Sequence, residues 1–167
     1  MTVRLPADLL PGPSDLWFLP LGGCGEIGMN LNLYGHDSRW LMVDCGVTFY
    51  NPLQPTTSPI TAEVQAADPA FITQRRELLS GIVITHAHED HIGALPFLWP
   101  RFGCPVYCTP FTAEILRRKI ARSGLSQNMP IIEIPLGGTS NIGPFLINWL
   151  SITHSVPEPQ ALLITTA

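Results

Sequence analysis

Three histidines and two acidic residues stand together at the end of a short apolar run, and this segment constrains the chain most. Residues 85–93 read Thr-His-Ala-His-Glu-Asp-His-Ile-Gly, directly after Ile82, Val83 and Ile84. A short apolar run behind a glycine, here Gly81, is typical of a buried strand. The chain has five histidines, so three at one strand end indicate a shared role rather than scattered solvation.

The residue types and their spacing predict metal binding. Neutral imidazole is the commonest metal ligand in proteins, and zinc accepts nitrogen or carboxylate oxygen at about 2.0–2.2 Å. On an extended backbone His86 and His88 can point the same way, while Asp90 and His91, past a tight turn, can face a neighbouring position. One segment can therefore serve two metal ions, and its spacing differs from that of the helical H-E-x-x-H motif.

A third imidazole is required to close the first site. His154 follows the expected strand 145–152. With His86 and His88 it would form a three-histidine site that leaves an open position for water. His36 lies in the expected turn 35–38, and we predict that it is exposed to solvent.

Glycine and proline divide the rest of the chain into short apolar runs and helical patterns. A hairpin first, strand–helix units next and strands last predict an α/β sandwich of sheets with helices on its outer faces. Residues 1–15 are expected to be an irregular lead-in to a domain spanning 16–167. The expected strands are 17–21, 29–34, 40–43, 81–85, 106–108, 131–134, 145–152 and 161–165. The expected helices are 68–79, one from about 92 and one from 110 to just before 124, and 51–61 is an expected loop.

The glycine-rich residues 23–28 also fit G-x-G-x-x-G, the dinucleotide-binding fingerprint. That motif requires a helix that begins at its third glycine. Here the following residues alternate as a strand and reach a turn by Gly35, so nucleotide binding is disfavoured. We expect a tight turn near the metal cleft, with Glu26 and Asn30 making local hydrogen bonds.

The segment H-A-H-E-D-H resembles the H-x-H-x-D-H signature of the metallo-β-lactamase superfamily. A finer resemblance, to the ribonuclease J family, rests on residues 22–30, on H-x-H-E-D-H-I-G and on T-H-S-V-P at 153–157. It implies the αββα sandwich of that superfamily, of which 16–167 would be the first half of a truncated domain. The inserted β-CASP domain and the remainder of such a protein would be absent.

The same resemblance gives roles to individual residues. It implies two zinc sites. The first would be formed by His86, His88 and His154, and the second by Asp90 and His91. Asp90 would also position the attacking water. Asp44, at a strand end, would fix the loop and the ligand orientation without binding metal. The family's bridging aspartate lies beyond residue 167, so we expect this chain to bind one zinc tightly and the second weakly.

The implied activity is zinc-dependent hydrolysis of RNA phosphodiesters, as a 5′ exonuclease or an endonuclease. The formal net charge is −4 and only 13% of residues are charged, so the chain would not be a nucleic-acid clamp by itself. RNA contacts would come from regions outside it. Two alternatives stay open: another hydrolase on this fold, such as a thioesterase of the glyoxalase II type, and an inactive truncated zinc-binding module.

The sequence predicts a cytoplasmic protein. No uninterrupted apolar run approaches the ~18 residues of a membrane span, so no membrane partner is expected. The four cysteines form no C-x-x-C pair, which favours ordinary buried thiols in a reducing compartment. Assembly of the full-length protein into a homo-oligomer stays open.

Overall fold

A computed structural model describes residues 10–49, 64–124 and 128–166. Strands of the larger sheet follow the order β1-β2-β3-β6-β7-β8. Their bounds are β1 Trp17–Gly22, β2 Leu31–His36, β3 Arg39–Val43, β6 Leu79–Val83, β7 Val106–Cys108 and β8 Ile131–Glu133. A smaller sheet, β11-β10-β9, contains β9 Thr139–Ile142, β10 Phe145–Ser151 and β11 Gln160–Thr166, and a two-stranded ribbon pairs β4 Val47–Phe49 with β5 Val64–Ala66.

The helices lie in the connections between the parallel strands β3, β6, β7 and β8. They are α1 Ala70–Thr73, α2 Glu89–Ile92, α3 Leu95–Phe102 and α4 Pro110–Ser123, with a 3₁₀ turn at Arg76–Leu78. The α4 helix begins and ends as its sequence predicts, after Thr109 and with Gly124 in the left-handed conformation that closes many helices. None of the helices in the described part of the chain is long and apolar enough to span a bilayer.

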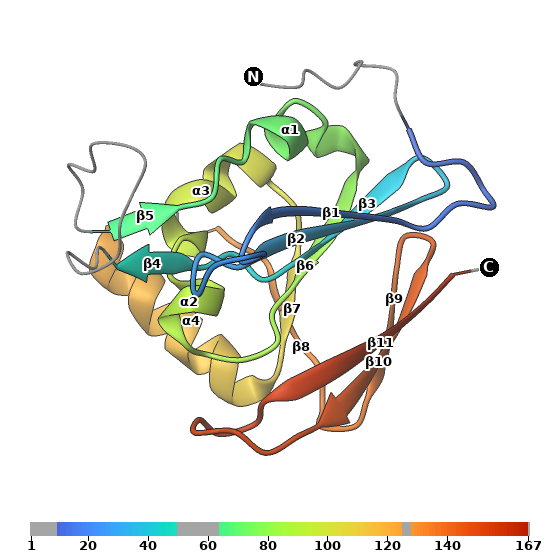
Figure 1. Ribbon diagram of the computed structural model, residues 1–167. Helices are drawn as coiled ribbons and strands as arrows, with labels where there is room; N and C mark the ends of the chain where they lie inside the picture. The colour runs from blue at the N-terminus through green and yellow to red at the C-terminus, as the bar shows by residue number, and fades with distance from the viewer. Residues whose placement is uncertain (1–9, 50–63, 125–127, 167) are drawn as a thin grey trace.

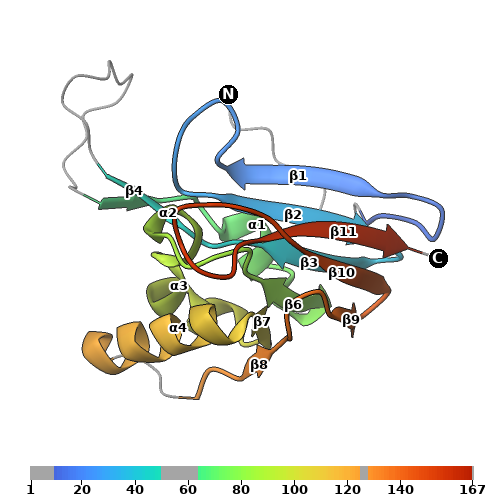
Figure 2. The same ribbon diagram turned by 90° about the horizontal axis from the view of Figure 1, so that it is seen from below.

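The elements form three layers, with the larger sheet in the middle. Figures 1 and 2 show α3 and α4 on one side of this sheet and the smaller sheet on the other. Successive residues of a strand point to opposite faces, and β3 shows this directly. Trp40 and Met42 join the apolar cluster under the helices. Leu41 and Val43 join the cluster between the two sheets, where Trp149 is also buried.

Two expectations about this part of the chain were wrong. The helix expected at 68–79 is one short turn, because Leu79 pairs in parallel with Trp40 and already belongs to β6. Tertiary pairing here overrides local helix propensity. His36 is buried, not exposed: its Nδ1 donates to the carbonyl oxygen of Asp15 at 2.7 Å. The expected loop at 51–61 lies outside the described residues.

The strands β4, β5 and β9 were not expected from the sequence. Residues 10–15 contain no helix or strand, and they pack over the β2–β3 turn. The backbone N–H groups of Asp37 and Ser38 donate to the carbonyl oxygens of Gly12 and Pro11. This cover explains why the neighbouring His36 is buried.

Candidate metal centre

Three histidines from two separate loops converge at one edge of the sandwich. His86 and His88 lie between β6 and α2, and His154 lies between β10 and β11. One ligand atom from each falls within 4.8 Å of the other two. The shortest approach joins His86 Nε2 and His88 Nδ1 at 3.1 Å, and both rings meet the His154 ring edge to face.

This donor set fits a zinc ion. Zinc–nitrogen bonds of about 2.0–2.1 Å in a tetrahedral site separate two nitrogens by roughly 3.3 Å, close to the observed His86–His88 approach. Small side-chain rotations would bring His154 to a similar distance. His86 is buried, His88 half-buried and His154 exposed, so one side of the cluster faces solvent and leaves access for water.

The electrostatics keep His86 ready to act as a ligand. Burial and the neighbouring His91 lower the pKa of His86 to about 4, although Asp44 acts in the opposite direction. The ring is therefore neutral at pH 7. Its Nδ1 lies 3.0 Å from the Thr85 hydroxyl, which leaves Nε2 to face His88.

Asp44 is buried behind the cluster and holds two of its neighbours. Its Oδ1 accepts the backbone N–H of Thr85 at 2.8 Å, and its Oδ2 lies 2.7 Å from His91 Nδ1. Because a carboxylate only accepts hydrogen bonds, His91 Nδ1 carries a proton, and the neutral ring would present the lone pair of Nε2. Burial lowers the pKa of His91, but the hydrogen bond to Asp44 and the charges of Asp44 and Asp90 outweigh it and raise the pKa overall.

A second position lies beside the three-histidine cluster. The Nε2 of His91 is 3.3 Å from Asp90 Oδ2, and the His91 ring centroid is 4.0 Å from that of His86. Both side chains are partly open to solvent. A carboxylate oxygen and an imidazole nitrogen at this separation offer two ligands to one ion.

The loop that carries His154 is fixed at its base. The backbone N–H of Gln160 donates to the carbonyl oxygen of Thr85 at 3.0 Å, which joins the start of β11 to the end of β6. The Glu158 carboxylate accepts the N–H of Phe111 at 2.9 Å, in the first turn of α4. No sequence pattern pointed to Thr85, Glu158 or Gln160, because each acts through contacts distant along the chain.

The glycine-rich turn agrees with its expected role. Gly23, Gly25 and Gly28 have positive φ values, and β2 follows in place of a helix. Glu26 accepts the N–H of Gly23, and the side chain of Asn30 donates to the carbonyl oxygen of Asp90. The local hydrogen bond predicted for Glu26 is confirmed, whereas the partner of the Asn30 side chain lies 60 residues away and is not local.

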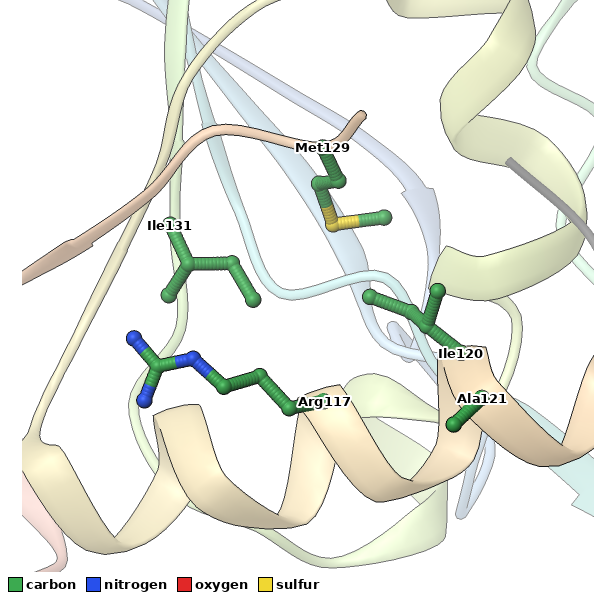
Figure 3. A pocket seen from close by; sticks show the side chains of 5 residues that line it. All are labelled: Arg117, Ile120, Ala121, Met129 and Ile131. Atoms are coloured by element: carbon green, nitrogen blue, oxygen red, sulfur yellow. The ribbon is translucent and has the colours of Figure 1, made fainter. Parts of the chain in front are cut away.

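Two hollows in the described surface lie apart from the histidines. One of about 400 Å³ lies between α4 and β8, and Figure 3 shows the side chains that line it: Arg117, Ile120, Ala121, Met129 and Ile131. The guanidinium of Arg117 is paired with Glu133. The other, of about 450 Å³, is largely apolar and lies among β4, β5, α3 and α4, with Glu89 and Lys119 in its lining.

Comparison with known proteins decides the family. A family model described as the beta-lactamase superfamily domain matches residues 39–165. The chain belongs to the beta-lactamase superfamily. Metallo-β-lactamase-fold proteins of known structure share its architecture at low identity. Rm3 metallo-beta-lactamase has a TM-score of 0.60 at 19% identity and covers 95% of this chain and 55% of its own. YhfI from Bacillus subtilis has a TM-score of 0.58 at 18% identity over 89% and 56%. The expected fold class is confirmed.

Sequence relatives of this beta-lactamase superfamily chain carry the name ribonuclease J. The one from Sinorhizobium meliloti is 47% identical over 91% of this chain and 27% of its own length. Those from Helicobacter pylori and Mycolicibacterium smegmatis are each 34% identical, over 88% and 97% of this chain. The chain spans 21–29% of the length of these relatives. The resemblance to the ribonuclease J family is confirmed.

Proposed function

We propose that this chain supplies the metal-binding part of a zinc-dependent hydrolase that cleaves RNA phosphodiester bonds. One observation carries the proposal: His86, His88 and His154 converge in a chain of which 91% matches a ribonuclease J at 47% identity. On this proposal residues 16–167 form part of a metallo-β-lactamase domain preceded by the lead-in 1–15. A longer protein in the cytoplasm, with the β-CASP region, would bind the RNA.

The side chains divide the work as follows. One zinc would be held by the three histidines, and the second, more weakly, by Asp90 and His91. Bound zinc supplies Lewis acidity and lowers the pKa of a coordinated water to about 7. Asp90, which is 38% exposed, can accept a hydrogen bond from the attacking water and orient it. Asp44 keeps one proton of His91 on Nδ1, so that Nε2 is the ring nitrogen that can bind a metal ion.

The charge of the chain supports a protein in which this part binds metal and other regions bind the RNA. The chain carries a formal charge of −4, which disfavours binding of a polyanion by its own surface. Positive charge from bound metal would act at the scissile phosphate, and further RNA contacts would come from the regions that complete the relatives' length. Cleavage from the 5′ end and internal cleavage are both compatible with this arrangement.

Metal content tests the first half of the proposal. The purified 167-residue chain should retain zinc by elemental analysis after dialysis against metal-free buffer, and His86→Ala and His88→Ala should lose it with modest effects on folding. His36→Gln is the matched control, since it removes a buried histidine outside the cluster and should leave zinc in place. Zinc retained in both cluster variants would overturn the site.

Substrate choice tests the second half. Zinc-loaded protein of the relatives' full length should cleave a 5′-monophosphorylated RNA, and chelation or His86→Ala should abolish cleavage. A glutathione thioester is the competing substrate, because a zinc site of this kind also suits attack on a carbonyl. Thioester hydrolysis without RNA cleavage would favour the glyoxalase II type of reaction. Inactivity on both, with zinc bound, would favour a non-catalytic module.

A further inference from the structure

The backbone carbonyl of Asp90, beside the second metal position, makes its hydrogen bonds outside its own helix. In a continuous helix the carbonyl oxygen of Asp90 would accept the N–H of Ala94. The Ala94 N–H donates instead to the carbonyl oxygen of Cys45 at 3.1 Å, so α2 ends after one turn. This frees the Asp90 carbonyl for another donor.

Asn30 supplies that donor twice. Its backbone N–H and its side-chain Nδ2 each donate to the Asp90 carbonyl oxygen at 3.0 Å. The same Nδ2 lies 3.4 Å from His91 Nε2. Because a carbonyl oxygen only accepts hydrogen bonds, the amide nitrogen must face it. One side chain therefore touches both members of the Asp90–His91 pair.

The surrounding backbone is shaped for this contact. A Cβ at Gly46 would stand 1.6 Å from the Asp90 carbonyl oxygen, so only glycine lets that carbonyl come so close. The Gly46 N–H donates to the carbonyl oxygen of Asn30, and the Cys45 N–H donates to that of His91. Asn30 thus ties the glycine-rich turn, the segment after β3 and α2 together at one point.

We infer that Asn30 is a positioning residue for a second metal ion: its amide fixes the Asp90 backbone, and this holds Asp90 and the adjoining His91 in place as ligands. The inference rests on the proposed function, since it presupposes metal at the centre. An aspartate at position 30 would lose both N–H donors of the amide and set an oxygen against the Asp90 carbonyl. An alanine would leave that carbonyl with only the backbone donor.

Stepwise metal titration of the metal-free 167-residue chain tests the inference. Calorimetry with zinc, and visible absorption with cobalt, should show a tight first step and a weaker second step. Asn30→Ala and Asn30→Asp should weaken the second step by about 10–100-fold, the usual effect of losing a partner of a metal ligand. The first step should change by less than about 2-fold. Asn141→Ala, an exposed asparagine on β9, is the matched control.

The outcomes separate the inference from the function. A second step that is absent from the wild-type chain, or equal in strength in both Asn30 variants, overturns the role of Asn30 while the three-histidine site stands. Loss of the first step from the wild-type chain overturns the proposed function itself. Thermal unfolding of each variant guards against misfolding. If Asn30→Ala does not fold, Asn30→Asp, which keeps the side-chain volume, carries the test.

Discussion

The backbone of Asp44 has a conformation that few residue types adopt. Its φ is 63°, in the left-handed region where aspartate and asparagine are enriched among non-glycine residues. The position therefore favours a short polar side chain. The carboxylate also forms hydrogen bonds with Thr85 and His91. Residue choice here satisfies the backbone and the metal centre together.

Asp44→Asn separates these two requirements. Asparagine keeps the backbone and can still accept the Thr85 N–H, but its Nδ2 would face His91 Nδ1. The proton of His91 would then move to Nε2 and block metal binding there. We expect about 1–3 kcal/mol lower free energy of unfolding, from the loss of a buried charged hydrogen bond, and loss of the second metal step. Urea unfolding and calorimetry measure the two effects.

Asp44→Ala is the comparison for this prediction. Alanine removes both hydrogen bonds and tolerates the positive φ poorly, so it should destabilise the chain more than asparagine does. Equal metal uptake by wild type and Asp44→Asn would contradict the proposed control of the His91 proton.

Buried thiols give the chain a predictable sensitivity to alkali. Burial raises the pKa of Cys104 and Cys108 from 9.0 to about 12. Below pH 9 these thiols are protonated in both states. Between about pH 9 and pH 12 the unfolded chain releases protons that the folded chain keeps, so the free energy of unfolding falls as pH rises. Urea unfolding at about pH 8 and about pH 10.5 measures the loss.

Two variants test whether the buried thiols cause that loss of stability. Cys108→Ala removes one of the titrating groups and should show a smaller difference between the two pH values. Cys24 is exposed, so Cys24→Ser should behave as the wild type does. An alkaline loss that is the same in Cys108→Ala and the wild type would show that other groups cause it.

At the scale of single residues, the sequence predicts a functional residue only where its type and position have few structural explanations. The histidine segment and His154 could be chosen because imidazoles cluster at strand ends, and the structure brings their side chains together. The burial of His36 could not be foreseen, because it depends on residues 10–15 folding back over a turn. The contact of Asn30 with Asp90 spans 60 residues and leaves no local pattern.

At the scale of elements, one carboxylate links the β10–β11 loop to α4, in addition to the backbone hydrogen bond between Gln160 and Thr85. Glu158 accepts the Phe111 N–H and has a positive φ of 58°. Glu158→Gln should weaken zinc binding at the three-histidine site several-fold, since His154 would lose part of its support, and should lower the free energy of unfolding by about 0.5–1.5 kcal/mol. Calorimetry and thermal unfolding measure these changes.

Glu114→Gln is the matched control for Glu158→Gln. Glu114 pairs with Arg118 on the exposed surface of α4, where such pairs contribute little. It should leave zinc affinity unchanged. Unchanged affinity in Glu158→Gln as well would show that the loop holds His154 without this anchor.

Elements were predictable where the local pattern matched their environment. The α4 helix has a proline at its start, a glycine at its end and one apolar face, and its bounds follow. The β9 strand is Thr-Ser-Asn-Ile, which lacks strong alternation and is ordered by pairing with β10. The helix expected at 68–79 was wrong: α1 ends at Thr73, a 3₁₀ turn follows, and Leu79 pairs with β3 as part of β6.

At the scale of the molecule, the layers could be inferred because apolar residues cover both faces of the central strands. Their alternation fills one core under the helices and another between the sheets. The outer face of the smaller sheet is different. Leu146, Leu150 and Leu163 remain 39–54% exposed there, which the one-dimensional pattern of β10 and β11 does not distinguish from burial.

This face and its open edge predict self-association of the 167-residue chain. In the described residues β11 pairs only with β10, and its sequence Gln-Ala-Leu-Leu-Ile-Thr-Thr has no charge or proline. Charge, proline and bulges are the features that protect edge strands. Two copies can therefore pair β11 with β11, antiparallel, and join their exposed leucines. Analytical ultracentrifugation should show a concentration-dependent dimer that Leu163→Lys weakens. Leu136→Lys, at an exposed leucine outside the strands, should leave the dimer intact, and a wild-type chain that stays monomeric at high concentration would contradict the pairing.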